Sequence, residues 1–422
     1  MTKKIYVLGG GTVFHVRPHL AISAPAYGNV ANKIFHELER KLIEKNGSLE
    51  EEMPVIGLTK MANPNGRTET YIGETNQDVG GFLEKIVTDP DTSMIFMSVA
   101  LCDYEGFILD DTKKLTVSGK GQPRLQTKDG SAGMLLRPAD KLIGEIRKAR
   151  KDIFLIGFKT TAGATEDEQF ETGLNLLKKN SCNLVLANDV QTGLNMIIVP
   201  EVARYELTHD RDKAVKTLVE MALSRSTNTF ARTQVIGDAS ELVSWTSPEV
   251  PSVLRSVVEW SASQGAYNPF NDVTVGHFGF KVSENSLISS RRRQNFNRPE
   301  CLDLVKVDFL EHRQVAHGAK PSAGARSQYE VLSRFTDLNC IIHFHCPMKP
   351  GSEVPVRSQK EFECGSHQCG KNTADGMVRV NEHLAAVMLD KHGPNIVFSD
   401  KADPKMVIDF IKNNFMVNLQ TR

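Results

Sequence analysis

The sequence lacks any long apolar run. No stretch approaches the roughly 18 consecutive apolar residues that cross a bilayer, so we expect no membrane-spanning segment. The first four residues lead into a short strand-like run, and no signal-peptide cleavage site precedes it. We therefore expect a cytoplasmic protein.

The sequence also lacks an excess of charge of one sign and a paired pattern of cysteines. Its 51 basic and 51 acidic residues cancel, which argues against a general nucleic-acid binder, although residues 291–293 form a local patch of three arginines. The seven irregularly spaced cysteines do not fit a secreted disulfide framework, so we expect thiols. Internal repeats and low-complexity tracts are absent from the sequence.

The chain is long enough for two compact domains, or at most three, with 422 residues of which 40% are hydrophobic. Continuous apolar runs at 94–100 and 153–158 are typical of strands buried on both faces of a parallel sheet. Amphipathic stretches at 29–45 and 168–179 alternate with such runs. This alternation predicts a doubly wound, Rossmann-like α/β domain.

The pattern loosens over residues 223–249, which we interpret as a linker between a domain at 1–222 and a second domain at 250–422. The second domain contains an alternating run at 302–309 and a helix-like stretch at 376–389. Strands and helices do not alternate strictly there, so we predict an α/β domain with an antiparallel component.

A glycine loop at residues 9–12 follows the first predicted strand. Backbone N–H groups in such a loop can approach a phosphate, but this loop has neither a dinucleotide fingerprint nor a P-loop lysine. On its own, the loop also fits a plain turn.

Several further segments follow this loop in a fixed order. They are Gly28 before a helix, the run Val99-Ala-Leu-Cys-Asp-Tyr104, two lysines about ten residues later, Gly157-Phe158, and Leu184-Val-Leu-Ala-Asn-Asp-Val190. Together they resemble the phosphopantothenate-cysteine ligase family of coenzyme A synthesis over roughly residues 1–222. That family uses CTP or ATP to activate 4'-phosphopantothenate, and cysteine then displaces the nucleotide.

The resemblance assigns roles residue by residue. It implies that the nucleotide phosphates lie against Gly10, Gly11, Thr12 and Gly28, and the base or ribose against Phe158 and Asn188. It implies that the pantothenate arm and cytidylate lie near Val99, Ala100 and Asp103, with Lys113 as the catalytic lysine. Lys113 and Lys114 also fit ordinary surface charges.

One position departs from that family. An ungapped comparison puts Ala24 where the family has its catalytic asparagine, and alanine has no amide to hold an acyl-nucleotidylate. Asn29 could substitute only if the loop is rebuilt.

The sharpest short motif is His343-Phe344-His345, at the end of an apolar run. Alternation along a strand puts both imidazoles on one side, close enough to share a metal ion. Three imidazoles, here with His392 as the third, and an open position are typical of a catalytic zinc or similar divalent site. A chance occurrence of the short motif stays open as the alternative.

The C-terminal half resembles the class II aldolase/adducin family over roughly residues 250–422. The resemblance is carried by Lys320-Pro-Ser, by the run 340–347 and by His392-Gly393. It implies a divalent metal held by His343, His345 and His392 that acts as a Lewis acid on a small phosphorylated compound. Cleavage, epimerisation, dehydration and decarboxylation all occur in that family, and a carboxylate moves the proton.

This family's acidic residue is missing, because Gly324 occupies its position. Its phosphate-binding segments are also altered, and Arg291 is our candidate to hold a phosphate or carboxylate. Three glutamates are candidate replacement bases: Glu330, Glu361 and Glu363. We favour Glu363 because it precedes a Cys-Gly pair.

Two sets of metal-ligating residue types remain outside this assignment. Cys364, His367 and Cys369 fit either a second metal site or a polar loop with free thiols. Eight histidines show no grouping and are interpreted as surface or core residues: His15, His19, His36, His209, His277, His312, His317 and His383.

The sequence therefore predicts a two-domain, metal-dependent enzyme with aldolase-like lyase or epimerase chemistry on a phosphorylated or nucleotide-linked small molecule. One alternative is an active phosphopantothenate-cysteine ligase in coenzyme A synthesis. The other is a binding or assembly protein that has lost its chemistry, which Ala24 and Gly324 suggest. By analogy with both families, we expect a homo-oligomer that binds a nucleotide.

Overall fold

The computed structural model describes residues 2–63, 71–310 and 313–419. The chain divides into two compact units. Unit 1 comprises Met1–Val199 and Glu206–Ser226, and unit 2 comprises Pro200–Tyr205 and Thr227–Arg422. Among the described residues, no helix has the length and apolar character needed to cross a membrane.

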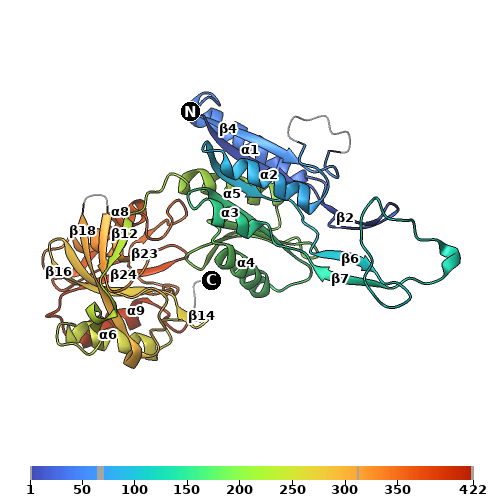
Figure 1. The fold of residues 1–422 in the computed structure, drawn as a ribbon. Helices are drawn as coiled ribbons and strands as arrows, with labels where there is room; N and C mark the ends of the chain where they lie inside the picture. Colours follow the sequence, from blue (N-terminus) through green and yellow to red (C-terminus); the bar gives the residue numbers. More distant parts are fainter. Residues whose placement is uncertain (1, 64–70, 311–312, 420–422) are drawn as a thin grey trace. The chain divides into compact units, whose positions relative to one another are not determined.

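Unit 1 is built on a seven-stranded sheet in the order β11-β10-β9-β8-β5-β1-β4 (Figure 1). Its strands are β1 (Lys3–Gly9), β4 (Glu52–Leu58), β5 (Thr92–Met97), β8 (Phe154–Thr161), β9 (Leu184–Asp189), β10 (Asn195–Val199) and β11 (Ala203–Thr208). The five strands from β9 to β4 are parallel, and β10 runs antiparallel to β9.

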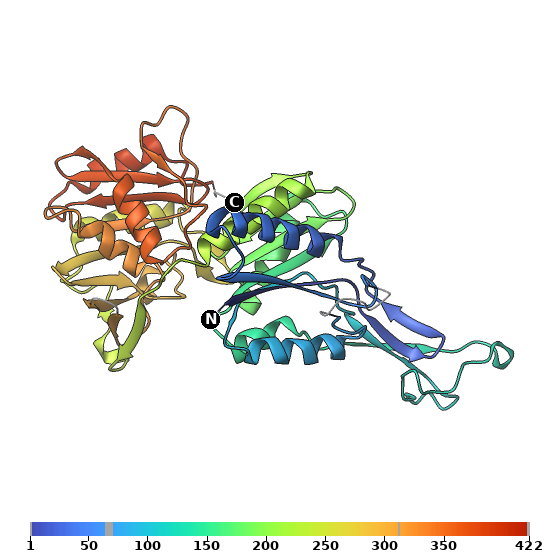
Figure 2. The same cartoon turned by 90° about the horizontal axis from the view of Figure 1, so that it is seen from above.

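Helices cover both faces of this sheet, with α1 and α5 on one side and α2 and α3 on the other (Figure 2). They are α1 (Asn29–Asn46), α2 (Asn76–Thr88), α3 (Ile143–Ala149), α4 (Glu166–Asn180) and α5 (Arg211–Arg225). The buried side chains of α1 repeat every three to four residues, as the sequence pattern predicted: Ala31, Ile34, Leu38 and Leu42. The predicted doubly wound domain is confirmed.

Two hairpins stand outside this sheet. They are formed by β2 (Val13–Arg17) with β3 (Leu20–Ser23) and by β6 (Tyr104–Ile108) with β7 (Met134–Pro138). The β6–β7 hairpin and the loop at 109–133 extend away from the sheet as an arm (Figure 1).

Unit 2 contains an eleven-stranded, mainly antiparallel sheet, as predicted for the second domain. Its main path is β12 (Arg232–Ile236), β19 (Arg313–His317), β18 (Asp303–Leu310), β17 (Ser286–Ser290), β16 (His277–Ser283), β20 (Cys340–His343), β24 (Gly393–Phe398), β23 (Leu384–Leu389) and β21 (Val356–Arg357). Off this path, β13 (Val243–Ser244) pairs with β18 and β22 (Val378–Asn381) pairs with β23. A separate two-stranded sheet joins β14 (Pro269–Phe270) and β15 (Val273–Thr274).

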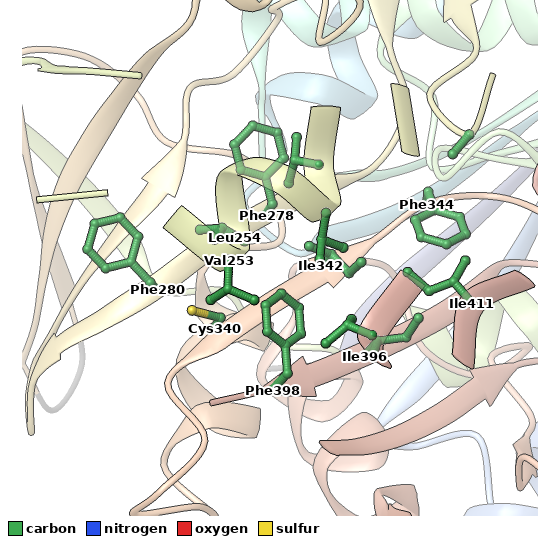
Figure 3. Packing of buried hydrophobic residues seen from close by; sticks show 14 of the residues in the cluster. Val253, Leu254, Phe278, Phe280, Cys340, Ile342, Phe344, Ile396, Phe398 and Ile411 are labelled. Carbon is green, nitrogen blue, oxygen red and sulfur yellow. The ribbon is translucent and has the colours of Figure 1, made fainter. Parts of the chain in front are cut away.

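Two pairs of helices pack against each other in unit 2: α6 (Ser252–Ser263) with α9 (Pro404–Asn414), and α7 (Ala325–Leu332) with α8 (His367–Gly376). Alternation along β20 separates two cores. Ile342 joins Phe278, Phe398 and residues of α6 and α9 in one cluster (Figure 3), whereas Ile341 joins residues of α7 and α8 in another.

Two sequence predictions differ from the observed elements. The predicted helix at 376–389 is the hairpin of β22 and β23, because a short apolar run buried on both faces fits a strand as well as a helix. Residues 223–249 contain β12 and β13, and both pair within the sheet of unit 2. The edge strand β12 is largely exposed and lacks the apolar run from which a strand can be predicted.

Replacing Phe398 with alanine should lower the unfolding free energy of unit 2 by about 3–5 kcal/mol, because it leaves a cavity between the sheet and α6. Both tryptophans, Trp245 and Trp260, lie in unit 2, so tryptophan fluorescence during urea unfolding follows this unit alone. The control is Val378→Ala at a 53% exposed position, which should cost less than about 0.5 kcal/mol. Equal costs for the two variants would contradict the packing described here.

Candidate functional site

Three buried histidines converge in unit 2. The ring centroids of His343 and His345 lie 5.0 Å apart, those of His343 and His392 4.6 Å, and those of His345 and His392 4.5 Å. One potential ligand atom from each ring lies within 4.8 Å of the others. In the described part of the chain, these imidazoles form the one group of three or more such side chains.

The positions of these rings follow from β20 and the turn before β24. Phe344 is part of the core at α6 and α9, so the neighbours on either side of it, His343 and His345, face the opposite way. The turn that carries His392 comes close because Gly393 has φ +148°, and a Cβ there would lie 2.1 Å from the carbonyl oxygen of Phe344. Only glycine allows this approach.

The hydrogen bonding of His343 leaves one nitrogen available to a ligand. Its Nδ1 donates to the carbonyl oxygen of Pro394 at 2.8 Å, which fixes the proton on Nδ1. Its Nε2 is buried and has no hydrogen-bond partner among the described residues. Burial lowers the pKa of His343 to about 4, so the ring is neutral at pH 7. A neutral imidazole anchored through its other nitrogen is the form that binds a metal, so these residues fit a divalent ion.

A fourth histidine, His277, lies beside this cluster, where the sequence interpretation placed only a surface or core residue. It is paired with His343 across β16 and β20, and the two ring centroids are 4.8 Å apart. Burial, together with the nearby His343, lowers the pKa of His277 well below its usual value. His277 has no short motif around it, so only the register of the two strands reveals its position.

His277 occupies the space that a side chain at Gly324 would enter. A Cβ built on Gly324 would lie 2.4 Å from Nε2 of His277. The amide nitrogen of Gln328 donates to Nδ1 of His277 at 2.9 Å, so the neutral ring carries its proton on Nε2. Gly324, where the resemblance leads us to expect an acidic residue, therefore adjoins a neutral N–H donor.

The candidate glutamates are engaged elsewhere. Glu330 forms an ion pair with Arg326 at 2.6 Å, and Glu361 accepts a hydrogen bond from Ser358 at 3.0 Å. Glu363 belongs to the loop before α8, where its backbone N–H donates to Asn228 at 2.7 Å. None of them joins the histidine group among the described residues. The role of Glu363 as a base stays a prediction.

Arg291 directly follows strand β17 and lies beside the segment that precedes α7. It forms an isolated antiparallel bridge with Pro321, and Ser322 donates its backbone N–H to the carbonyl of Ser290 at 2.8 Å. These contacts bring Arg291 next to the segment that leads to Gly324. The Arg291 guanidinium lies 3.9 Å from Asp303, a weak ion pair that a ligand anion can replace.

Of the two interpretations of Cys364, His367 and Cys369, a second metal group does not appear among the described residues, where only the three histidines are grouped. His367 begins α8 and donates its backbone N–H to Thr229 at 2.9 Å. His312 lies outside the described residues.

Unit 1 offers a second candidate site at the carboxyl ends of β1 and β5. The strand order reverses between these two neighbours, and open α/β sheets bind ligands in the crevice at such a point. Gly10 and Gly11 follow β1, and Ala100 follows β5 and donates its N–H to the carbonyl of Gly10 at 2.9 Å. Gly28, which precedes α1, lies against Ala62, as does Gly10.

The glycines and Thr12 also have contacts within the protein. A Cβ on Gly11 would lie 2.0 Å from the carbonyl oxygen of Ala24, so packing alone requires glycine there. The buried hydroxyl of Thr12 donates to Asn76 at 2.7 Å and accepts from the N–H of Cys102 at 2.8 Å. Thr12 therefore holds the loops after β1 and β5 together.

The residues predicted around the substrate are spread over unit 1. Val99 is buried beside Ala100. Asp103 is exposed and paired with Lys141. Lys113 lies in the arm. The five residues of β6, which span about 17 Å, stand between it and Asp103. The structure therefore does not bring Lys113 next to Asp103, whose partner is Lys141.

The two residues predicted at the base or ribose lie on neighbouring parallel strands. Phe158 is half-buried on β8, and Asn188 is buried on β9, where its side-chain oxygen accepts from Thr160 at 3.2 Å. Both precede the carboxyl ends of their strands, the edge at which the β1–β5 crevice lies.

Comparison with known proteins identifies the type of domain in unit 2. Residues 261–403 match the family model for the Class II Aldolase and Adducin N-terminal domain. The resemblance of the C-terminal half is confirmed, and His277, His343, His345 and His392 all lie inside the matched range. No curated protein matches the chain.

Solved structures are similar to each part of the chain. A DNA/pantothenate metabolism flavoprotein from Streptococcus pneumoniae is 19% identical and covers 52% of this chain and 97% of its own, with a TM-score of 0.43. The C-terminal domain of the coenzyme A biosynthesis bifunctional protein CoaBC is 15% identical, with coverages of 52% and 92% and a TM-score of 0.36. An L-fuculose 1-phosphate aldolase is 14% identical, with coverages of 39% and 82% and a TM-score of 0.29.

Replacing Gly324 with alanine should destabilise unit 2 by about 1–3 kcal/mol, because the new methyl group collides with His277. The backbone at Gly324 has φ −77°, so alanine adds no backbone strain. In a His277→Ala background, the cost should fall to about 0.5 kcal/mol or less. The wild type, the two single variants and the double variant form a double-mutant cycle, and urea unfolding followed by tryptophan fluorescence gives the unfolding free energy of each. Additive costs would show that the two positions do not share space.

Proposed function

We propose that this protein is a metal-dependent enzyme whose unit 2 performs aldolase-like lyase or epimerase chemistry on a phosphorylated or nucleotide-linked small molecule. The observation that carries the proposal is the convergence of three buried imidazoles within a domain of the class II aldolase type. A protein that only binds partners has no need for three buried nitrogen ligands around one point. The buried Nε2 of His343 has no hydrogen-bond partner among the described residues, and a bound ion would offset the free energy that this burial costs.

Zinc or another divalent ion held by His343, His345 and His392 would supply a Lewis acid that polarises a substrate oxygen. The neighbouring His277 offers an Nε2–H donor, which can hydrogen-bond to a substrate oxygen as negative charge develops on it. Gln328 keeps this donor in the required tautomer. Arg291 is suited to hold the phosphate or a carboxylate of the substrate.

The proton-transfer step distinguishes this site from the family pattern. The family's acidic residue is replaced by Gly324, and the candidate group of ligands among the described residues contains no carboxylate. A neutral imidazole can donate a hydrogen bond from its Nε2–H to a substrate oxygen or hold a water molecule, so we assign His277 the role of hydrogen-bond donor. The retained metal ligands and the changed acid–base group support a reaction related to aldol cleavage rather than that reaction itself.

For unit 1 we propose a nucleotide-binding role at the crevice between β1 and β5. Gly10 and Gly11 follow β1, Gly28 precedes α1, and Phe158 and Asn188 lie on strands that end at the same edge. Because Ala24 lacks the amide expected of an active ligase, we favour binding or activation of the substrate there over complete ligase chemistry. CTP and ATP are the nucleotides to test.

Purified protein should contain about one divalent ion per chain, and His343→Ala should reduce that content to about one-tenth or less, because two imidazoles bind a divalent ion poorly. Inductively coupled plasma mass spectrometry gives the metal content. His383→Ala, a change at an exposed histidine, is the matched control and should leave it unchanged.

The metal content of the His277→Ala variant shows whether His277 is a hydrogen-bond donor or a metal ligand. We expect this variant to retain the ion, as it should if His277 is a donor. Metal-free wild-type protein, or a His343→Ala variant with full metal content, would favour the alternative of a binding protein that has lost its chemistry. Circular dichroism of each variant shows whether the fold persists.

CTP or ATP should raise the melting temperature of unit 1, with a stabilisation of about 2.7 kcal/mol at a concentration of 100 times the Kd. Unit 1 has no tryptophan, so hydrogen exchange of its amides gives the unit-specific measurement. Asn188→Ala should remove most of the effect, and Lys85→Ala on the outer part of α2 should not. If neither nucleotide protects unit 1, the nucleotide-binding proposal is wrong.

A further inference from the structure

Two segments of unit 2 pair with each other and bring positive charges together. One segment directly follows β17, and the other precedes α7. Arg291 forms an antiparallel bridge with Pro321, and the backbone N–H of Arg292 donates to the carbonyl of Lys320 at 3.0 Å. In this register, Arg292 and Lys320 are directly opposite each other.

Arg292 and Lys320 are like charges without a counter-charge of their own. Directly opposite residues of an antiparallel pair have Cβ atoms about 4.5–5.5 Å apart, and like charges in these positions destabilise the pair. Both side chains are exposed, and neither forms an ion pair within the part of the chain that the structure describes. Asp303 faces Arg291 instead, at 3.9 Å. A bound anion would therefore stabilise this pair of segments.

Arg293 adds a third positive charge, in a turn whose backbone is strained. Its φ of +63° lies in the left-handed region that side chains other than glycine rarely adopt. The next residue, Gln294, is buried, and its carbonyl accepts the backbone N–H and the hydroxyl of Thr274, both at 3.1 Å. Strain of this kind persists where the surrounding structure holds it, and it is concentrated at ligand-binding sites. Arg293 is exposed and has no ion pair among the described residues.

The same segment leads back to the candidate active site. The hydroxyl of Ser290, the last residue of β17, accepts the backbone N–H of Phe278 at 3.3 Å. Phe278 directly follows His277, which lies beside the three metal-ligand candidates. Arg292 is two residues beyond Ser290, so it is on the same side of the extended chain and about 7 Å further along. The positive charges therefore lie next to the histidine group.

We propose that Arg292, Arg293 and Lys320 form an anion site that binds two linked phosphates, so that the substrate of unit 2 is an organic diphosphate rather than a monophosphate. This inference rests on the function proposed above, because it names the substrate class of that site. A phosphate monoester carries only about 1.5–2 negative charges at pH 7, so three positive charges match a diphosphate better. The planar guanidinium groups also bind phosphate oxygens in pairs.

The test compares inorganic pyrophosphate with inorganic phosphate as probes of the full-length protein. Urea unfolding followed by tryptophan fluorescence reports on unit 2 alone, and its dependence on probe concentration gives the affinity of each probe. The protein carries His343→Ala and is treated with a chelating resin, so that no ion at the histidines binds the probe. We expect pyrophosphate to bind unit 2 at least about tenfold more tightly than phosphate.

Variants assign this affinity to individual side chains. Arg292→Ala and Lys320→Ala should each weaken pyrophosphate binding about tenfold or more, because each removes a charged hydrogen-bond donor. Arg293→Asn should weaken it as well, and asparagine tolerates the left-handed backbone. Without a probe, Arg292→Ala should unfold at the same urea concentration as its parent or at a higher one, because it removes the like-charge contact. The matched control is Lys401→Ala, an exposed position before α9, which should leave the affinity within about twofold.

Equal affinities for the two probes would overturn the proposal, as would pyrophosphate binding that neither Arg292→Ala nor Lys320→Ala weakens. A single-stranded oligonucleotide that stabilises unit 2 more than pyrophosphate, at equal phosphate concentration, would overturn the assignment to a small molecule. The metal content of the wild-type protein tests the proposed function separately. Metal-free wild-type protein that still binds pyrophosphate through Arg292 would refute that function and the substrate assignment, but not the anion site.

Discussion

The alternation of side chains along β20 is the constraint on which the candidate active site depends. Ile342 and Phe344 must be buried with α6 and α9 because large apolar side chains gain about 1.5–3 kcal/mol each on full burial. The residues between and after them, His343 and His345, then have to face the other side of the sheet. The hydrophobic core thus fixes which way the two imidazoles point, and no polar contact has to do so.

The close contact between His277 and Gly324 explains how the site differs from the pattern that the class II aldolase resemblance implies. A glutamate cannot fit at Gly324 while His277 fills the adjoining space, and His277 needs Gly324 to have no Cβ. Replacing a carboxylate with a neutral imidazole removes a negative charge next to the three histidines. In the proposed function, a hydrogen-bond donor in place of a proton acceptor favours substrates whose oxygen becomes negative during the reaction.

Much of this architecture could be predicted from the sequence, because parallel strands and amphipathic helices have distinct periodicities. The grouping of His343, His345 and His392 also followed from a short motif. His277 could not be found in this way, since its nearness to His343 arises from the register of two strands whose paired histidines are more than 60 positions apart in the sequence. The strand β23 was mistaken for a helix because burial on both faces removes the alternation that identifies strands.

The short helix α7 supports both His277 and Cys369. Gln328 holds His277, and its neighbour Ser327 donates to Cys369. Successive helix residues point about 100° apart, so one rigid helix can support groups on two sides. Gly324 begins this helix, and the carbonyl of Ala323 just before it packs on Gly365. One helix of eight residues therefore holds both the His277 donor and the buried sulfur of Cys369 in place.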